Sequence, residues 1–413
     1  MIMNYKHCRF CDAVLQYIFV DLGTSPLANS YLESSQLHCM EPFYPLRVYV
    51  CKRCFLVQLD EFESPEHIFS DYAYFSSYSD TSLQHAKAYT DEMRVRFGLH
   101  EQSQVVEIAS NDGYLLQYFV EKGIPVLGIE PAGNVAEVAM AKGVPTLVKF
   151  FGQETAHELV ATGLHADLLV GNNVLAHVPD LNDFVAGMKI LLHAQGIITM
   201  EFPHLMRLME DVQFDTIYHE HFSYFSFITV EQVFAAHGLT IFDVDELPTH
   251  GGSLRIYACH SEDASKSVGK RVSELRVQEE AAGFTRLAHY LAFAERVKEV
   301  KRNILAFLIA AKREGKVIVG YGAPAKGNTL LNHCGIRSDL LDYTVDRSPH
   351  KQGHFLPGTH IPIFSPDVIK ETMPDYLLIL PWNLKDEIMA QMGYIRDWGG
   401  RFVVPIPDVK VYG

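Results

Sequence analysis

The stretch Val105-Val106-Glu107-Ile108-Ala109-Ser110-Asn111-Asp112-Gly113 decides the fold class of this 413-residue chain. It begins with a short apolar run that is typical of a buried strand and ends in a polar turn with a glycine. A helical pattern follows over residues 114–122, and a second strand is expected over residues 126–130. Strand, helix and strand in this order are joined by a right-handed crossover, so the stretch predicts a parallel sheet.

Further segments extend this α/β pattern in both directions along the chain. Residues 166–170 and 196–201 are expected to be strands of the same sheet. After a long helical stretch over roughly residues 264–313, strands are expected again, at residues 316–322, 340–345 and 376–380. The sequence therefore predicts two α/β domains, at 71–262 and 263–413, behind a small module at 1–70, with the helical stretch as a linker.

Composition and charge limit the classes of partner. The apolar content of 48% and charged content of 21% are those of an ordinary soluble globular protein. A formal net charge of −15 argues against duplex nucleic acid or an anionic membrane as the main partner. The first ten residues carry Lys6, His7 and Arg9 without a long apolar run, so we expect no secretion signal and a cytoplasmic location.

Four of the seven cysteines form two pairs of identical spacing, Cys8-x2-Cys11 and Cys51-x2-Cys54. Each pair can turn two thiolates toward one ion, and two pairs complete a tetrahedral sulfur site that suits zinc. A module of about 70 residues buries little surface alone, so a structural metal makes physical sense. Four unrelated buried thiols are the alternative, and His38 and Cys39 lie between the pairs as other candidate ligands.

The turn after the first strand indicates which ligand the parallel sheet binds. Glu130, at the end of the next strand, is placed to accept the two ribose hydroxyls of an adenosine, as S-adenosylmethionine or a dinucleotide would require. The turn lacks the G-x-G-x-x-G spacing of a pyrophosphate site and instead carries Glu107 and Asp112. Two acids repel a pyrophosphate but tolerate a sulfonium with an ammonium tail, which favours a methyl donor. A strand end capped by an acid, with no ligand, is the alternative.

Gly320-Tyr321-Gly322-Ala323-Pro324-Ala325-Lys326-Gly327 forms a second glycine-bearing turn, in the last α/β segment. Backbone amides at a helix N-terminus, with a lysine beside them, can hold a phosphate. Glycine is also used in tight strand-to-helix turns for steric reasons alone, so both interpretations stay open.

Groups that move protons near neutral pH gather in three other segments. Tyr218-His219-Glu220-His221 places a phenol, a carboxylate and two imidazoles in four consecutive residues. His177 follows a strand of the first sheet, and His250-Gly251-Gly252-Ser253 lies on a later connection. Each histidine alone is more often structural than catalytic, but together at one edge of the sheet they suggest acid–base chemistry beside a methyl donor.

With these motifs in this order, nearly the whole chain resembles the sugar C-methyltransferases, which add a branch methyl to nucleoside-diphosphate-linked keto-deoxysugars. The resemblance rests on the two cysteine pairs, residues 107–116, Phe214-Asp215-x-x-Tyr218-x-Glu220-His221, His250-Gly251-Gly252 and Gly320-Tyr321-Gly322-Ala323-x-Ala325-Lys326. Two positions depart from the pattern: His219 stands where an acid is common, and Ala109 where glycine is common.

The resemblance implies a zinc-binding N-terminal module, a central Rossmann-like class I methyltransferase domain and a C-terminal Rossmann-like domain, with the sugar nucleotide in the cleft between the last two. The implied reaction is methyl transfer from S-adenosylmethionine to C3 of an NDP-4-keto-6-deoxy sugar, in branched deoxysugar biosynthesis. The implied cofactor-binding residues are Tyr74, Ser77, Glu107, Asn111, Asp112, Gly113, Glu130, Asn172 and Asn173. The implied substrate-binding residues are Glu201, His250, Gly251, Arg255, Tyr321, Lys326 and Asn383.

A sugar carbon becomes nucleophilic only when a base removes its proton and the neighbouring ketone takes up the charge. We expect His221 to be that base, Tyr218 and His177 to hold or protonate the enolate oxygen, and Glu220 to orient an imidazole or a sugar hydroxyl. Hydrogen bonds can hold the enolate, so no catalytic metal is expected and the zinc is structural. The nucleoside, thymidine or guanosine diphosphate, is left open, and a monomer is expected.

Three other functions remain open on the sequence. An O- or N-methyltransferase acting on a sugar nucleotide would need no carbon acid. A nicotinamide-dependent sugar-nucleotide oxidoreductase would use the turn at Gly320. A sugar-nucleotide binding protein without catalysis would keep only the fold.

Overall fold

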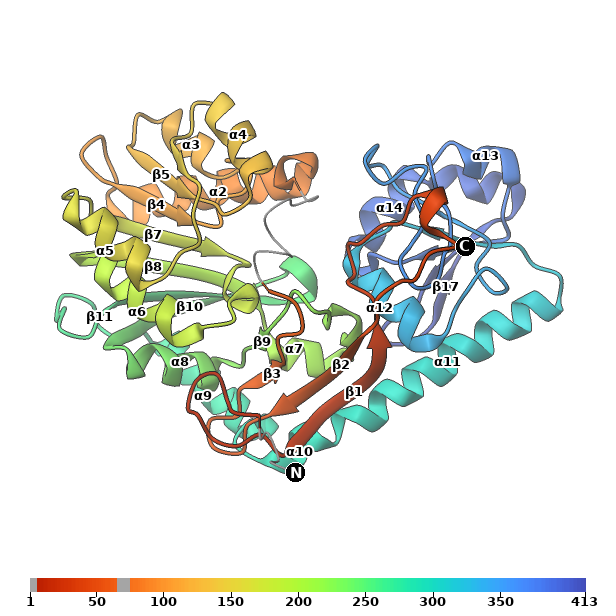
Figure 1. Ribbon diagram of the computed structural model, residues 1–413, viewed down its shortest axis with the longest axis horizontal. Helices are drawn as coiled ribbons and strands as arrows, with labels where there is room; N and C mark the ends of the chain where they lie inside the picture. The colour runs from red at the N-terminus through yellow and green to blue at the C-terminus, as the bar shows by residue number, and fades with distance from the viewer. Residues whose placement is uncertain (1–5, 65–74) are drawn as a thin grey trace.

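The computed structural model describes residues 6–64 and 75–413, and these residues contain three β-sheets. Figure 1 shows two lobes side by side, a central lobe from the middle of the chain and a C-terminal lobe, with the N-terminal strands at their base. This α/β arrangement is the fold class that the sequence predicts. None of the helices within the described ranges combines the length and apolar character that crossing a lipid bilayer requires.

The central lobe is built on a seven-stranded sheet with the order β10-β11-β8-β7-β4-β5-β6. Five strands from β8 to β6 are parallel, and β10 and β11 extend the sheet antiparallel beyond β8. All four residues of the predicted first strand, β4, are buried, because helices cover both faces of the sheet. The strands are β4 (Val105–Ile108), β5 (Val126–Ile129), β6 (Thr146–Leu147), β7 (Ala166–Asn172), β8 (Leu192–Pro203), β10 (Leu239–Leu247) and β11 (Ser253–His260).

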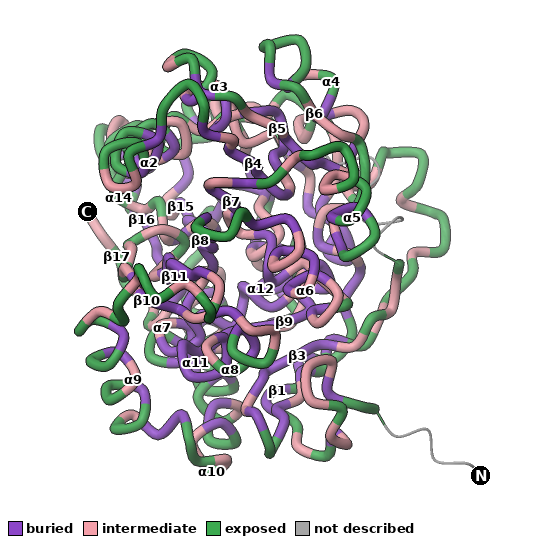
Figure 2. The backbone as a smooth tube through the Cα atoms, turned by 90° about the vertical axis from the view of Figure 1, so that its left-hand side faces the viewer, coloured by how far each residue is buried: buried purple, intermediate pink, exposed green. Residues whose placement is uncertain are grey.

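Two groups of helices bury apolar faces on opposite sides of this sheet. One group packs around Met93, Phe119 and Ala139, and consists of α2 (Asp80–Phe97), α3 (Leu116–Val120) and α4 (Gly133–Ala141). The other packs around Met188 and Phe234, and consists of α5 (Gln153–Ala161), α6 (Leu181–Leu191), α8 (Phe227–Ala236) and α9 (Lys270–Ala282). In Figure 2 the strands of the sheet are accordingly buried and the outer turns exposed.

The C-terminal lobe contains a six-stranded sheet with the order β14-β13-β12-β15-β16-β17, parallel except for β17. The strands are β12 (Ile318–Tyr321), β13 (Thr344–Val345), β14 (Ile363–Phe364), β15 (Tyr376–Ile379), β16 (Arg401–Val404) and β17 (Lys410–Tyr412). The helices are α12 (Ala325–Cys334), α13 (Val368–Thr372) and α14 (Lys385–Gln391). The glycine turn that the sequence predicts joins the central strand, β12, to α12.

The N-terminal sheet is completed by a strand from the central lobe. Its order is β1 (Tyr17–Ser25), β2 (Tyr44–Val50), β3 (Val57–Leu59) and β9 (Ser223–Tyr224), all antiparallel. Val57 pairs with Tyr224 and Gln58 with Ser223. The strand β9 begins two residues after His221, so the segment that carries the proton-moving groups leads into the N-terminal sheet.

The helical stretch expected over residues 264–313 consists of three helices in the structure. These are α9, α10 (Leu287–Leu291) and α11 (Phe293–Arg313). The chain leaves α9 at Gly283, whose φ of 108° suits glycine best. The helix α9 packs on β10 of the central sheet, whereas α10 and α11 pack on β1, so the stretch belongs to the body of the protein.

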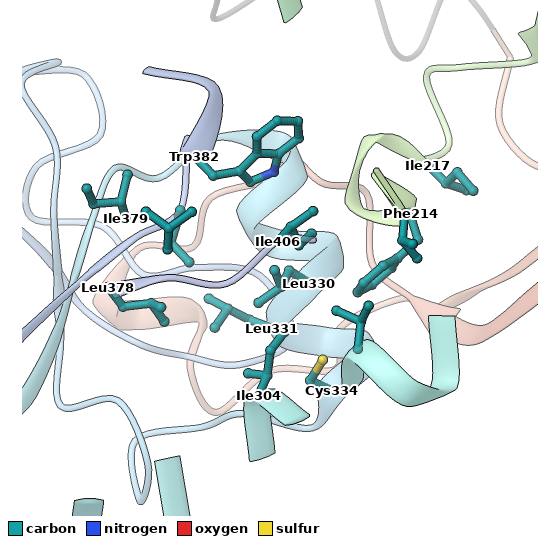
Figure 3. Close-up of a cluster of buried hydrophobic side chains, with 14 of the residues drawn as sticks. Phe214, Ile217, Ile304, Leu330, Leu331, Cys334, Leu378, Ile379, Trp382 and Ile406 are labelled. Carbon is teal, nitrogen blue, oxygen red and sulfur yellow. The ribbon is translucent and has the colours of Figure 1, made fainter. Parts of the chain in front are cut away.

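The core of the C-terminal lobe continues into the central lobe. Phe214 and Ile217 from the central lobe lie in the same apolar cluster as Leu330 and Leu331 of α12 and the ring of Trp382. Figure 3 shows these side chains together. The short helix α7 (Leu205–Glu210) of the central lobe contributes to the same cluster. The two lobes are therefore joined by buried apolar side chains as well as by the chain.

Candidate active site

The ring of His221 is held by a backbone carbonyl. Its Nδ1 lies 2.8 Å from the oxygen of Thr216, the last residue of the 3-10 turn η4 (Phe214–Thr216). A carbonyl oxygen can only accept a hydrogen bond, so Nδ1 carries the hydrogen and Nε2 keeps a lone pair in the neutral ring. Burial, followed by the neighbouring His177, lowers the pKa of His221 well below its ordinary value of 6.5. The neutral ring is thus the form present at physiological pH.

His177 and Tyr218 lie against the His221 ring. The centroid of the His177 ring is 4.7 Å away in an edge-on arrangement, and that of Tyr218 is 4.0 Å away. His177 ends the 3-10 turn η3 (Leu175–His177) after β7, and the amide of Phe222 donates to the carbonyl of Ala176 over 2.7 Å. Burial lowers the pKa of His177 to about 4. The structure therefore brings three of the four predicted catalytic side chains into direct contact.

Glu220 and His219 point toward the N-terminal part of the chain. Glu220 is 4% exposed, and its Oε1 accepts a hydrogen bond from Asn29 Nδ2 over 2.6 Å. His219 packs on Tyr44 and Phe62, and its Nε2 lies 3.3 Å from the carbonyl oxygen of Pro45. His219 is therefore a packing residue of the N-terminal sheet.

The loop after β4 has an unusual backbone conformation. Ala109, Asn111 and Gly113 have φ values of 56°, 49° and 74°, in the left-handed region. A Cβ on Gly113 would lie 3.1 Å from Val144 and 3.2 Å from Ala139, so glycine is needed there. Asn111 Oδ1 accepts a hydrogen bond from the amide of Ser76 over 2.9 Å, which ties the loop to the 3-10 turn η2 (Ser76–Tyr78) that precedes α2.

Several buried oxygen atoms around this loop have no hydrogen-bond partner among the described residues. They are both carboxylate oxygens of Glu107, Oδ1 of Asp112, and the amide oxygens of Asn172 and Asn173. Burial, and then the charges of Glu130 and Asp112, raise the pKa of Glu107 well above its ordinary value. Unpartnered buried acceptors at the carboxyl ends of β4 and β7 fit a polar, positively charged ligand such as the sulfonium and ammonium groups of S-adenosylmethionine.

Glu130 and Ser77 lie beside the same loop. The two carboxylate oxygens of Glu130 accept hydrogen bonds from the amides of Asn111 and Ala132, both over 2.9 Å. Each oxygen keeps a second lone pair for a ribose hydroxyl. Lys142 Nζ donates to Ser77 Oγ over 2.7 Å and to Asp112 Oδ2 over 3.2 Å. Tyr74 falls outside the described residues.

Glu201 and Arg255 form a buried ion pair between β8 and β11. Arg255 Nη2 donates to Glu201 Oε2 over 3.0 Å, and His85 Nε2 lies 2.9 Å from the same oxygen. Burial opposes ionisation of Glu201, but His85 and Arg255 outweigh it and hold its pKa at about 2. The guanidinium of Arg255 is engaged within the central lobe, so its predicted contact with substrate stays a prediction.

The loop after β10 reaches from this ion pair to the C-terminal lobe. Thr249 Oγ1 donates to Glu201 Oε1 over 3.0 Å, and His250 Nε2 lies 3.3 Å from Asn173 Nδ2. His250 has a φ of 54°, in the left-handed region. A Cβ on Gly251 would lie 2.6 Å from the indole ring of Trp382, so the loop touches the other lobe closely.

Lys326 and Asn383 come together at the lobe boundary. Lys326 Nζ donates to Asn383 Oδ1 over 2.8 Å and lies 4.7 Å from the Trp382 ring centroid. Burial lowers the pKa of Lys326, and Asp215 opposes this. Trp382 follows β15 in the 3-10 turn η6 (Trp382–Leu384), and its Nε1 donates to Asp215 Oδ2 over 2.7 Å. Tyr321, at the end of β12, contacts Gln391 at 3.3 Å through its hydroxyl.

The four predicted metal ligands form one cluster. The sulfur atoms of Cys8, Cys11, Cys51 and Cys54 all lie within 4.8 Å of one another. A tetrahedral zinc ion with Zn–S bonds of about 2.3 Å places its sulfur ligands roughly 3.8 Å apart, so the cluster fits zinc. Cys39 is exposed and is not a member of this cluster, so it is wrong as an alternative ligand.

Two hollows lie near these groups. A small enclosed cavity of about 10 Å³ is bounded by Thr216, His221, Ser223 and Tyr224, which is room for about one water molecule. An open depression of about 560 Å³ lies beside the cysteine cluster, lined by Arg9, Pro179 and Asn182 among others. None of the predicted catalytic residues lines that depression.

Several residues that hold the site could not be predicted from the sequence. Asn29 and Lys142 are ordinary polar residues far from the motifs, and only the fold places them beside Glu220 and Asp112. His85 lies in α2 with no motif around it. For Trp382 a weak signal exists, since the chain has only two tryptophans and this one adjoins the predicted Asn383.

Comparison with family models assigns three consecutive parts of the chain. Residues 8–69 match the model described as "Putative zinc binding domain", residues 83–244 match "Methyltransferase domain", and residues 248–407 match "C-methyltransferase C-terminal domain". Together with the fold and the loop after β4, these matches define the class of protein: an S-adenosylmethionine-dependent methyltransferase with a zinc site.

The chain belongs to the C-methyltransferase family. It is 36% identical to the C-methyltransferase NovU of Streptomyces niveus over 404 residues, which is 98% of this chain and 96% of that protein. This membership decides against the O- or N-methyltransferase, the oxidoreductase and the binding protein without catalysis.

Two solved structures are similar to somewhat less than half of the chain. A protein of Pyrococcus horikoshii has a TM-score of 0.37 at 13% identity, covering 48% of this chain and 99% of its own. An S-adenosylmethionine-dependent methyltransferase from Clostridium acetobutylicum has a TM-score of 0.36 at 12% identity, covering 45% of this chain and 92% of its own.

Proposed function

We propose that the enzyme methylates C3 of a nucleoside-diphosphate-linked 4-keto-6-deoxy sugar through an enolate, in the biosynthesis of a branched deoxysugar. The observation that carries the proposal is the state of His221. Its Nδ1 hydrogen is fixed on the Thr216 carbonyl, which leaves Nε2 unprotonated on a ring that packs against a phenol and a second imidazole. A neutral base beside hydrogen-bonding groups is what removal of a proton next to a ketone needs.

The roles of the residues follow from these positions. His221 Nε2 takes the proton from C3, while Tyr218 and His177 hold the enolate oxygen by hydrogen bonds. The ring of His221 accepts the charge transiently, with the Thr216 carbonyl stabilising the Nδ1 hydrogen of the imidazolium. Bound S-adenosylmethionine supplies an electrophilic methyl group. The enolate carbon would form a bond to this methyl carbon as the carbon–sulfur bond of the donor breaks, so that S-adenosylhomocysteine leaves and the ketone re-forms.

The remaining predicted residues would bind the two ligands. The acceptors around the loop after β4 would hold the methyl donor, and Glu130 its ribose. Lys326 and Asn383, together at the lobe boundary, would bind the sugar nucleotide, with Tyr321, His250 and Gly251 beside them. Glu201 and Arg255 would contribute to substrate binding as a rigid ion pair. We also propose that the enzyme is cytoplasmic, where the zinc thiolates stay reduced, and monomeric.

The test is a product assay with both classes of nucleotide. The enzyme is incubated with S-adenosylmethionine carrying a ¹³C methyl group and either the thymidine or the guanosine diphosphate form of a 4-keto-6-deoxyhexose. We expect a carbon-bound methyl group at C3 by NMR, and exchange of the C3 proton in D2O when the donor is omitted. A methyl group on oxygen or nitrogen, or no exchange with either nucleotide, would contradict the proposal.

A further inference from the structure

A short N-terminal segment, residues 28–31, lies between the segment that carries the base and the glycine turn of the C-terminal lobe. We call this segment the strap. It follows β1 by three residues and bends at Leu27, whose carbonyl accepts the amide of Ser30 over 3.2 Å. None of its residues belongs to the motifs of the sequence, and none has a role in the function proposed above.

One end of the strap holds the carboxylate of Glu220. Asn29 Nδ2 donates a hydrogen bond of 2.6 Å to Glu220 Oε1, and the two residues are 191 positions apart in the chain. The carboxylate is nearly inaccessible to solvent, so this donor replaces part of its lost hydration. Because Glu220 adjoins His221, the position of the carboxylate fixes the local backbone that carries the base.

The other end of the strap holds the glycine turn. The hydroxyl of Tyr31 donates to the carbonyl of Ala323 over 2.6 Å, and Lys351 Nζ donates to the same oxygen over 2.9 Å. Asn328 Nδ2 donates to the carbonyl of Ala28. The Tyr31 hydroxyl also lies 3.3 Å from Asn29 Oδ1, but its one hydrogen is donated to Ala323, so the two ends are connected through the short backbone between Asn29 and Tyr31.

We propose that Asn29 is a positioning residue, which acts through Glu220 to set the Tyr218–His221 segment for proton removal. Through Tyr31 the strap holds this segment in register with the turn at Ala323. The inference rests on the proposed function only in that the segment bearing His221 carries the chemistry. Removing the amide leaves a buried carboxylate short of a donor, so Glu220 shifts toward another donor or water and the base moves with it.

The test first compares two variants of the strap, Asn29→Ala and Ser30→Ala, in the full-length, zinc-loaded enzyme. The substrate is the 4-keto-6-deoxyhexose nucleotide that wild type methylates, and the kinetic constants and the rate of C3 proton exchange in D2O are measured. Asn29→Ala is expected to lower kcat and the exchange rate about 10–100-fold, the effect of a lost hydrogen bond to a charged group, with KM for S-adenosylmethionine nearly unchanged. Ser30→Ala, at the exposed neighbour, is the matched control and is expected to match wild type.

Two further variants keep the test sharp. Asn29→Leu keeps a side chain of similar size and removes the donor without adding a charge, so it should show the same loss if Asn29→Ala does not fold. In the Glu220→Gln background, Asn29→Ala should lower kcat and the exchange rate little further, because both changes break the same Asn29–Glu220 interaction. Wild-type activity in both Asn29 variants, or fully additive losses in the double variant, would overturn the inference. Absence of methyl transfer in wild type would instead overturn the proposed function.

Discussion

The two nitrogens of the His221 ring have different surroundings, and this difference sets the chemistry of the side chain. Nδ1 is bound to a carbonyl that cannot donate, so the ring has one defined neutral tautomer. Burial, and then close contact with a second imidazole, make a positive charge on His221 unfavourable and lower its pKa. A histidine in this state is ready to accept a proton before substrate arrives.

The pH dependence of the enzyme should reflect this state. Burial and His177 lower the pKa of His221 well below 6.5, so the base stays neutral as the pH falls through the range where a solvent-exposed histidine becomes charged. We expect the acid limb of the kcat/KM profile to lie clearly below pH 6.5. His221→Gln should lose this limb along with about 10²–10⁴-fold of the rate. Circular dichroism at each pH separates titration from unfolding, and an acid limb at or above 6.5 would contradict the assignment.

At the residue scale the sequence could predict the chemical types in the site but not their partners. Tyr218, His221 and His177 were expected to lie together because all three fall at one edge of a predicted sheet, and they do. Their individual roles, and those of the ligand-binding residues, stay predictions. Asn29 and the carbonyl of Thr216 could not be predicted, since a carbonyl has no sequence signature and Asn29 reaches the site only through tertiary folding.

The strand β9 links the candidate site to the N-terminal sheet. It is a two-residue strand that pairs with β3 of the N-terminal sheet, and the amide of Leu59 donates to the carbonyl of Phe222 over 3.0 Å. Gln58 of β3 also donates from Nε2 to Cys8 Sγ over 3.2 Å, so the strand beside the base is tied to the cysteine cluster. The zinc site therefore supports the segment that begins with Tyr218.

Removing zinc should loosen this segment before the rest of the central lobe. After treatment with a strong chelator, we expect faster hydrogen exchange at the Leu59 amide and in residues 218–224, because the cysteine cluster no longer holds β3. The buried strands β4 and β7 should keep their protection and S-adenosylmethionine should still bind. Hydrogen exchange followed by mass spectrometry measures this, with zinc content determined in parallel. Full loss of zinc with unchanged protection at Leu59 would contradict the link.

Prediction of the elements from sequence succeeded where apolar runs were bounded by turns. The strands β4, β5, β7 and β12 lie within a residue or two of the expected ranges, because fully buried parallel strands are continuous apolar runs. The division of the helical stretch into three helices could not be predicted, because α9 and α11 have similar compositions and the break at Gly283 depends on which sheet each helix packs against. The strand β9 is too short for any periodicity to show.

For the whole molecule, the contact of Trp382 with Asp215 and Gly251 joins the two lobes beside the site. The indole donates to a carboxylate that is fully buried, and the other oxygen of that carboxylate has no partner among the described residues. Burial raises the pKa of Asp215 to about 6, while Lys326 and Trp382 lower it. Near neutral pH this carboxylate is thus charged and depends on its few donors.

Trp382→Phe should weaken the contact between the lobes in a pH-dependent way. The ring still packs, but the buried carboxylate loses a donor, at a cost of about 1–3 kcal/mol in the free energy of unfolding. The loss should be larger at pH 7.5 than at pH 5, since the pKa of Asp215 is about 6 and the neutral carboxyl group needs the donor less.

Trp398→Phe is the matched control for this prediction. That indole donates over 3.1 Å to the carbonyl of Pro374 within the C-terminal lobe. A carbonyl does not titrate, so the decrease in the free energy of unfolding should not depend on pH in this range. Urea unfolding at both pH values gives the comparison. If the change in the free energy of unfolding depended equally on pH in the two variants, the proposed role of Asp215 would be contradicted.

The division of the chain into three domains does not describe how the parts are joined. Boundaries near residues 70 and 262 remain predictions, and the first of them falls outside the described residues. Sequence patterns identify compact parts one after another along the chain. They do not reveal that Phe214 of one lobe packs in the core of another, or that one sheet takes strands from two parts.

The pairing of β3 with β9 also has a consequence for how the protein is made. During synthesis the N-terminal sheet leaves the ribosome with the edge of β3 unpaired, and it stays so until Tyr224 has been translated. Cysteine pairs already able to capture zinc can hold β2 and β3 in shape meanwhile, and so limit pairing with other nascent chains. Metal supply during translation would then determine the yield of soluble enzyme, independently of any need for the metal once folding is complete.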